Sequence, residues 1–288
     1  MRYVDRSQVK RPSCLDFNDS SSKARQELSR NVNAKKRSFK CYKDNSVKLA
    51  LERLFHGKCA YCESKYDSHQ PMDIEHYRPK NSKKYWWLAA VWENLLPSCI
   101  DCNRVRGHKQ FDAKTRKIIG LDNSGKGECF PLFGTMASPP KNLNAKVSNA
   151  SMNMSIALES PVLLNPTLDN VEDWLSYTDE AALLPSEEAM RDPSILKRVN
   201  KSISTLGLNR MGLVSSRNVV LLNLESLIYM VKKIVPLLKD DLSEHHKALL
   251  HELLVYIFRH IKTFEDERHP YSLMCKQVIR KKLGPIIR

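Results

Sequence analysis

Two cysteine pairs constrain this chain more than any other feature of its sequence. Cys59 and Cys62 form one C-x-x-C pair, and Cys99 and Cys102 form a second pair after 36 intervening residues. A C-x-x-C turn places two sulfur atoms on one side, so two such turns supply the four thiolates of a tetrahedral zinc site. We therefore expect these four residues to bind a structural Zn²⁺ ion, which contributes about 10–16 kcal/mol of folding free energy. A redox role would need a βαβ setting, which the surrounding sequence lacks.

The cellular compartment follows from two negative observations on the sequence. The first residues, Met1 to Arg6, have no apolar segment of the kind found in a secretory signal. No stretch approaches about 18 uncharged apolar residues, so no membrane span is expected. We therefore expect a cytoplasmic protein, in which cysteines stay reduced. The cysteines outside the two pairs are interpreted as ordinary thiols: Cys14, Cys41, Cys129 and Cys275.

The charge of the chain is concentrated in its first half. The 288 residues carry a formal net charge of +15. Residues 1–120 hold 26 Lys and Arg against 13 Asp and Glu, whereas residues 121–288 hold 21 against 19. Such a basic half predicts a polyanionic partner, with nucleic acid favoured and an anionic membrane as the alternative. A membrane-surface protein would need a basic amphipathic helix, and residues 1–120 offer no convincing one.

The N-terminal half is predicted to mix short helices and short strands. Residues 1–22 are polar and aperiodic, so we expect a loose basic arm there. A helix is predicted from Asp44, a favourable N-cap residue, to His56, because Gly57 supplies a C-terminal stop. Its apolar face has the spacing of an amphipathic helix and consists of Val47, Leu51, Leu54 and Phe55. Short β-like segments are expected between residues 72 and 111, and a strand over 116–121.

The C-terminal half is predicted to be mostly helical. One apolar stripe runs from Val220 to Val235 and ends at Pro236, and a second runs from Leu250 to Ile261. We therefore assign the chain to the α+β class. We divide it into an arm at residues 1–22, a mixed domain with the cysteine pairs at residues 23–135, and a helical domain at residues 136–288.

The residues around the cysteine pairs fit phosphodiester hydrolysis. That reaction needs a divalent metal on oxygen ligands, a base that deprotonates water, and cations that bind phosphate. Glu75 and Asn103 offer metal-binding oxygens, and His76 offers the base. The candidate phosphate-binding cations are Arg78, Lys80, Arg106 and Lys109.

Four segments together carry a family resemblance. They are Cys59-Ala60-Tyr61-Cys62-Glu63, Ile74-Glu75-His76-Tyr77-Arg78-Pro79-Lys80, Trp92-Glu93-Asn94-Leu95-Leu96 and Cys99-Ile100-Asp101-Cys102-Asn103. In this order they resemble an HNH endonuclease of the ββα-metal type with zinc knuckles. More narrowly, the chain resembles the PtuB-like HNH effectors of Septu anti-phage systems, which also occur with some retrons. The resemblance extends to Leu163-Leu164-Asn165-Pro166, Leu206-Gly207-Leu208-Asn209-Arg210 and Arg217, and so covers most of the chain.

The resemblance implies a role for each motif residue. His76 matches the general base that activates water. Glu75 stands where the family usually has Asp, as a ligand of the catalytic Mg²⁺ or Mn²⁺, and Asn103 matches the last ligand of that metal. Asn94 matches the middle Asn that fixes the loop. Asp73 is in phase with Glu75 on a strand and is a second candidate for the metal ligand.

The resemblance also implies a substrate and partners. The implied activity is cleavage of nucleic acid, with DNA favoured and RNA such as tRNA as the alternative. The implied controlling partner is an ABC/SMC-like ATPase (PtuA-like) in a hetero-oligomer, joined in retron systems by a reverse transcriptase and its RNA–DNA. This chain has no Walker A loop, so the ATPase would be a separate chain. We expect residues 136–288 to dock on it through the stripe at 220–235, unless that stripe packs within its own bundle.

A second function remains open from the sequence. A zinc-ribbon protein that binds nucleic acid or acts as an adaptor, without catalysis, would also explain the cysteines and the basic half. It would not explain Glu75 and His76 together with Asn94 and Asn103.

Two other residue groups have simpler interpretations. The tryptophans between the cysteine pairs could stack on bases, but beside a small β unit they are expected in the core: Trp86, Trp87 and Trp92. The segment after His251 lacks the second histidine of a zinc-protease motif. We therefore expect the histidines of this segment, His245, His246 and His251, to face solvent.

Overall fold

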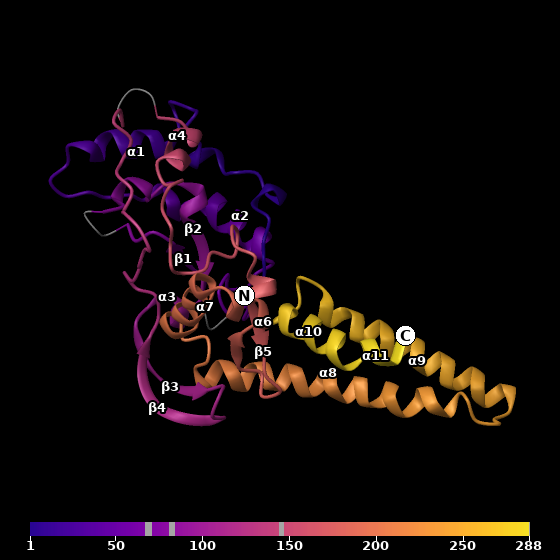
Figure 1. Ribbon diagram of the computed structural model, residues 1–288. Helices are drawn as coiled ribbons and strands as arrows, with labels where there is room; N and C mark the ends of the chain where they lie inside the picture. The colour runs from indigo at the N-terminus through magenta and orange to yellow at the C-terminus, as the bar shows by residue number, and fades with distance from the viewer. Residues whose placement is uncertain (67–70, 81–83, 144–146, 288) are drawn as a thin grey trace.

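The computed structural model describes residues 1–66, 71–80, 84–143 and 147–287. It combines helices with three two-stranded antiparallel sheets, so the predicted α+β class is confirmed (Figure 1). The chain before residue 211 forms a body, from which α8 (Met211–Leu237) and α9 (Glu244–Glu265) project as a long arm, with the two last helices packed alongside them (Figure 1). Among the described residues, no helix is both long enough and apolar enough to span a bilayer.

The N-terminal segment is packed against the body, and the prediction of a loose arm at residues 1–22 is wrong. It contains the short helices η1 (Arg6–Gln8) and η2 (Ser13–Leu15). Four of its apolar side chains are buried: Met1, Val4, Leu15 and Phe17. The Arg6 guanidinium donates to the carbonyls of Trp92 (3.0 Å) and Leu95 (2.6 Å). These anchors are irregularly spaced, so they leave no periodic signal in the sequence.

Helix α2 delivers the chain to the first cysteine pair. After α1 (Lys23–Val32) and η3 (Cys41–Lys43), α2 spans Asn45–Phe55. Asp44 caps it by accepting from the amide of Ser46 at 3.0 Å, and His56 ends it in the left-handed conformation. The predicted apolar face is buried, which confirms the predicted helix.

A strand–strand–helix unit follows the first cysteine pair, and its helix contains Cys102 of the second pair. Strand β1 (Asp73–His76) pairs antiparallel with β2 (Leu95–Ser98), so that Asp73 lies opposite Ser98. Between them lie η4 (Trp86–Leu88) and η5 (Trp92–Asn94). The single-turn helix α3 (Ile100–Asn103) follows β2 directly. Trp87 and Trp92 are buried, as expected, and Trp86 is half-buried beneath Arg37.

A second hairpin follows α3. Strands β3 (Arg106–Asp112) and β4 (Lys117–Ser124) pair antiparallel, with an irregularity between Gln110 and Phe111. Strand β4 confirms the strand predicted over 116–121. The elements between this hairpin and the arm are α4 (Asn149–Met154), α5 (Val171–Trp174), β5 (Leu175–Tyr177), β6 (Leu183–Pro185), α6 (Glu187–Arg191) and α7 (Pro193–Thr205).

The arm consists of the predicted C-terminal helices. Helix α8 (Met211–Leu237) contains Pro236 in its last turn, and α9 (Glu244–Glu265) returns alongside it. Helices α10 (Ser272–Lys282) and α11 (Gly284–Ile287) complete the chain. The histidines expected at the surface, His245, His246 and His251, are exposed on α9.

One hydrophobic cluster runs through the body and into the arm. It includes Met1, Leu51, Leu96, Leu164 and Leu224. These residues come from all three segments into which the sequence was divided. The boundaries at residues 22 and 135 therefore do not separate independent hydrophobic cores.

Candidate active site and metal centre

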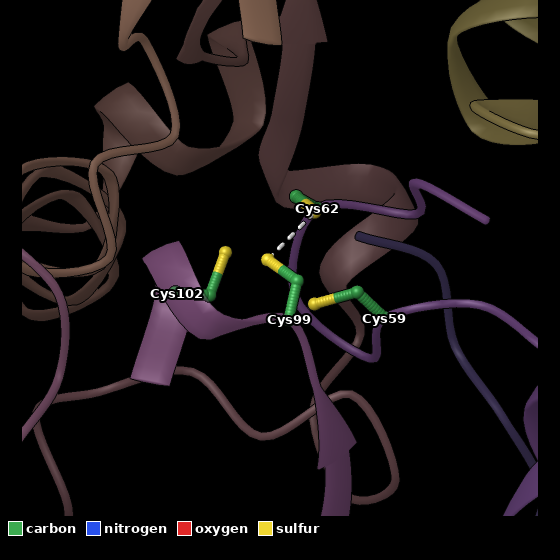
Figure 2. Close-up of side chains that lie close together, drawn as sticks. All are labelled: Cys59, Cys62, Cys99 and Cys102. Carbon is green, nitrogen blue, oxygen red and sulfur yellow. Dashed lines mark hydrogen bonds between the residues drawn. The ribbon is translucent and has the colours of Figure 1, made fainter. Parts of the chain in front are cut away.

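The four cysteines of the two pairs converge on one point. Cys59 and Cys62 lie in the turn after α2, whereas Cys99 precedes α3 and Cys102 belongs to it (Figure 2). All four are buried, and their sulfur atoms lie within 4.8 Å of one another. The Cys62 and Cys99 sulfurs are 3.8 Å apart. That separation equals the edge, about 3.8 Å, of a tetrahedron with zinc–sulfur distances of about 2.3 Å. The four cysteines could therefore hold a metal ion such as zinc.

A buried cation completes this centre. The two terminal nitrogens of the Arg210 guanidinium lie 3.5 Å from the Cys102 sulfur and 3.6 Å from the Cys99 sulfur. Four thiolates around Zn²⁺ leave a net charge of about −2, which a neighbouring guanidinium offsets. Arg210 is the N-cap residue of α8 and therefore ties the arm to the cysteine cluster. Spacing along the sequence gives no sign of this contact, because it joins residues 108 positions apart.

Loss of one cysteine is expected to remove the metal and destabilise the fold. In Cys99→Ser, we expect zinc to fall from about one ion to none per chain and the melting temperature to fall by about 10 °C or more. Metal analysis and thermal unfolding measure both quantities. Cys129→Ser, which alters a half-buried cysteine outside the cluster, is the control. A Cys99→Ser chain that kept its zinc and its melting temperature would contradict the assignment.

His76 ends strand β1 and is held in one tautomer. Its Nε2 lies 3.0 Å from the carbonyl oxygen of Ala89. A carbonyl can only accept, so Nε2 carries the hydrogen and Nδ1 keeps a free lone pair. Burial, with the charges of Lys80 and Lys126, lowers the pKa of His76 to about 3. The ring is therefore neutral at physiological pH, while the ring of Tyr42 packs edge-on against it at 4.6 Å between centroids.

Asn94 fixes the loop that holds His76. Its side-chain oxygen accepts from the amide of Arg78 at 2.7 Å, and its side-chain nitrogen donates to the carbonyls of Arg78 (3.0 Å) and Leu88 (3.3 Å). Leu88 directly precedes Ala89, the partner of the His76 ring. Asn94 is thus placed to position His76 through the loop, and the side chain is itself buried.

Asp73 and Asn103 lie together at the opposite end of β1. The Asn103 side-chain nitrogen donates to Asp73 Oδ2 at 3.0 Å, and the Arg104 guanidinium makes two 3.1 Å hydrogen bonds to the same carboxylate. A cavity of about 350 Å³ opens beside them and is also lined by Tyr42, Lys43 and Lys48. Lys43 and Lys48 were not among the phosphate-binding residues predicted from the sequence.

Glu75 pairs with a buried lysine instead. Its Oε1 forms a buried ion pair with Lys126 Nζ at 2.7 Å, and the same Nζ donates to the carbonyl of His76 at 3.0 Å. Burial raises the pKa of Glu75, and the Lys126 charge offsets only part of that effect. Of the two acids considered from the sequence, Asp73 and not Glu75 contacts Asn103.

The predicted phosphate-binding cations divide into two pairs. Arg78 forms a buried ion pair with Glu159 at 2.6 Å, and Lys80 donates to the hydroxyl of Tyr42 at 2.8 Å. The side chain of Arg78 is thus buried in an ion pair and does not face a phosphate at the surface.

The other two cations lie on β3. Arg106 makes a half-exposed ion pair with Asp101 at 2.9 Å, and Lys109 is exposed. Both are therefore available at the surface, next to the helix that carries Asn103.

The burial of His76 predicts a pH-dependent stability. The unfolded chain protonates His76 near its ordinary pKa of 6.5, whereas the folded chain keeps it neutral down to about 3. The free energy of unfolding contributed by this group therefore falls as pH drops from 6.5 towards 3, by up to about 1.4 kcal/mol per pH unit. Between pH 7.5 and 5.5, urea unfolding should show a loss about 1.4 kcal/mol smaller in His76→Gln than in the wild type. Exposed His251→Gln should keep the wild-type loss, and an equal loss in all three proteins would refute the assignment.

The comparisons with known proteins support the resemblance to Septu PtuB proteins. No protein-family model matches the chain. The chain is 28% identical to the Septu protein PtuB of Bacillus mycoides (strain KBAB4), across 93% of this chain and 86% of that protein. The Septu protein PtuB of Bacillus thuringiensis is 42% identical over 74 residues, which are 25% of this chain and 27% of that protein. The Septu protein PtuA of Bacillus mycoides is 25% identical over 191 residues, 62% of this chain but 21% of that protein. Over nearly its whole length, the chain is thus similar to a Septu PtuB protein.

Proposed function

We propose that this chain is a metal-dependent HNH endonuclease that acts as the effector of a Septu-type anti-phage defence system. Similarity to Septu PtuB proteins supports the system. One structural observation supports phosphodiester hydrolysis as the activity. The strand–strand–helix unit carries a neutral His76 whose Nδ1 is unprotonated, and its Asp73 contacts Asn103 of α3.

We assign different roles in the proposed reaction to His76 and to the pair Asp73 and Asn103. His76 Nδ1 takes a proton from the attacking water, while Ala89 and the loop fixed by Asn94 hold the ring in place. Asp73 and Asn103 would hold Mg²⁺ or Mn²⁺, which when bound stabilises negative charge on the phosphate and on the leaving oxygen. We assign the carboxylate ligand to Asp73 and a structural role to Glu75, because Glu75 is paired with Lys126.

Cations around the cavity favour a phosphate backbone. Lys43 and Lys48 line it, and Arg104 lies at its edge on Asp73. The side chain of His76 is only 5% exposed beneath Tyr42. We therefore propose that Tyr42 moves before water and nucleic acid reach Nδ1, which would restrain cleavage in the free chain.

The proposal includes a controlling partner. We propose an ABC/SMC-like ATPase of the PtuA type, and a retron reverse transcriptase with its RNA–DNA where the system is retron-associated. The stripe at residues 220–235 packs within the helical bundle, because Leu224, Ile228 and Val231 are buried there, so it is not the docking surface that the sequence predicted. We propose instead that the ATPase docks on the outward side of the arm. Its exposed apolar side chains include Val219, Leu222 and Tyr229 on α8 and Leu253 and Tyr256 on α9.

A nicking assay tests the activity. With Mg²⁺ or Mn²⁺, the chain with its ATPase partner should cut plasmid DNA, and His76→Ala should reduce the rate by about 100-fold or more. His251→Ala, an exposed histidine on α9, should cut at the wild-type rate. A His76→Ala protein that cuts like the wild type would refute the proposal. A wild-type protein that binds nucleic acid without cutting it in either metal would favour the zinc-ribbon adaptor.

The two acids of β1 are expected to respond differently to neutralisation. Asp73→Asn should lose metal-dependent cutting and keep its melting temperature, because Arg104 is 60% exposed and contributes little as an ion-pair partner. Glu75→Gln should lose about 3–5 kcal/mol of stability, since it leaves Lys126 charged and buried. Cleavage rates and thermal unfolding of both variants measure this. A Glu75→Gln protein of normal stability without activity, beside an active Asp73→Asn protein, would reverse the assignment.

A further inference from the structure

The β3–β4 hairpin forms a basic ribbon that extends from the body beyond α3 (Figure 1). Its strands have 7 and 8 residues, which corresponds to about 25 Å in length. Residues 106–124 contain five Lys and Arg against two Asp. Every residue of β4 from 117 to 123 is exposed, so this strand is an open edge.

The base of the ribbon, where β3 begins and β4 ends, is fixed to the helix that carries Asn103. Strand β3 begins three residues after Asn103, and beyond the end of β4 the amide of Gly127 donates to the carbonyl of Asn103 at 2.7 Å. Gly125 makes this return possible. It has a φ of +121°, and a Cβ there would lie 2.0 Å from the carbonyl oxygen of Arg104. The ribbon therefore has a defined position relative to Asp73 and Asn103.

The cations of the ribbon are available to a ligand. Arg106 and Arg116 form ion pairs, but both are more than half exposed, and exposed pairs of this kind are weak. Three exposed lysines, Lys109, Lys114 and Lys117, have no ion-pair partner within 4.0 Å among the residues that the structure describes.

Apolar side chains stand between these cations. Ile118, Ile119 and Leu121 are 56%, 65% and 76% exposed. In the register of the hairpin Leu121 lies opposite Lys109, beside the bare backbone of Gly107. Exposed apolar side chains framed by unpaired lysines suit a ligand with an anionic backbone and apolar edges inside a groove.

We propose that the β3–β4 ribbon binds duplex DNA by entering its major groove next to the Asp73–Asn103 site. The three free lysines contact phosphates, and Ile119 and Leu121 contact base edges. The B-form major groove, about 12 Å wide, admits a two-stranded ribbon. The major groove of A-form RNA is too deep and narrow for side chains to read, so the ribbon selects duplex DNA over duplex RNA. This inference rests on the proposed endonuclease function and names its substrate.

Binding by the full-length chain, in buffer without added Mg²⁺, tests the ribbon. The probes are a labelled 30-base-pair DNA duplex and an RNA duplex of the same sequence, followed by fluorescence anisotropy from 50 to 200 mM salt. In Lys109→Glu/Lys114→Glu/Lys117→Glu, we expect DNA affinity to fall by about tenfold or more and the salt slope by about 3. Leu121→Ser should weaken DNA binding without changing that slope.

A matched control removes the effect of net charge. Lys232→Glu/Lys239→Glu/Lys262→Glu makes the same charge change at exposed positions of the arm and should bind DNA within about twofold of the wild type. Zinc content and melting temperature should equal wild-type values in both triple variants.

Several outcomes would overturn the proposal. The ribbon triple variant could bind DNA like the control, or the wild type could bind duplex RNA as tightly as duplex DNA. A ribbon variant with normal DNA binding that lost a self-association seen by sedimentation would assign the open edge to protein instead. A chain that binds DNA through the ribbon but cuts nothing in Mg²⁺ or Mn²⁺ would refute the endonuclease and leave the ribbon intact.

Discussion

The convergence of four cysteine sulfurs within 4.8 Å of one another is the constraint on which the rest of the site depends. It joins the turn after α2 to the start of α3, and Arg210 connects α8 to the same sulfurs. Helix α3 has only four residues, too few for a helix to be stable alone. Its geometry, and therefore the position of Asn103, comes from the packing of the cysteine cluster and from the backbone hydrogen bonds that Lys126 and Gly127 donate to it.

Around that centre, one four-residue strand gives its polar side chains three different environments. Asp73 faces the cavity beside Asn103, Glu75 is buried against Lys126, and the His76 ring is held by Ala89. The carboxylates of Asp73 and Glu75, two residues apart, therefore have different surroundings. Asp73, whose side chain is 23% exposed, is the proposed cation ligand, whereas the buried Glu75 holds Lys126 against the carbonyl of His76.

Local signals predicted much of this arrangement from the sequence. The cap and apolar face of α2, the approach of the two cysteine pairs, the arm helices and the buried tryptophans all follow from neighbouring residues. The polar pairs between residues far apart in the sequence cannot be predicted in this way. Arg78 and Glu159 are 81 residues apart, and nothing near either residue marks it as buried. The packing of residues 1–22 could not be predicted for the same reason, since the buried side chains of this segment contact residues far along the chain.

Anomalous diffraction distinguishes a structural zinc at the cysteines from a separate hydrolytic metal site. A crystal of the chain grown with Mn²⁺ and a DNA duplex would be measured at the zinc and manganese absorption edges. We expect a zinc peak among Cys59, Cys62, Cys99 and Cys102, and a manganese peak at Asp73 and Asn103. A manganese peak on Glu75, or no zinc among the four sulfurs, would contradict this expectation.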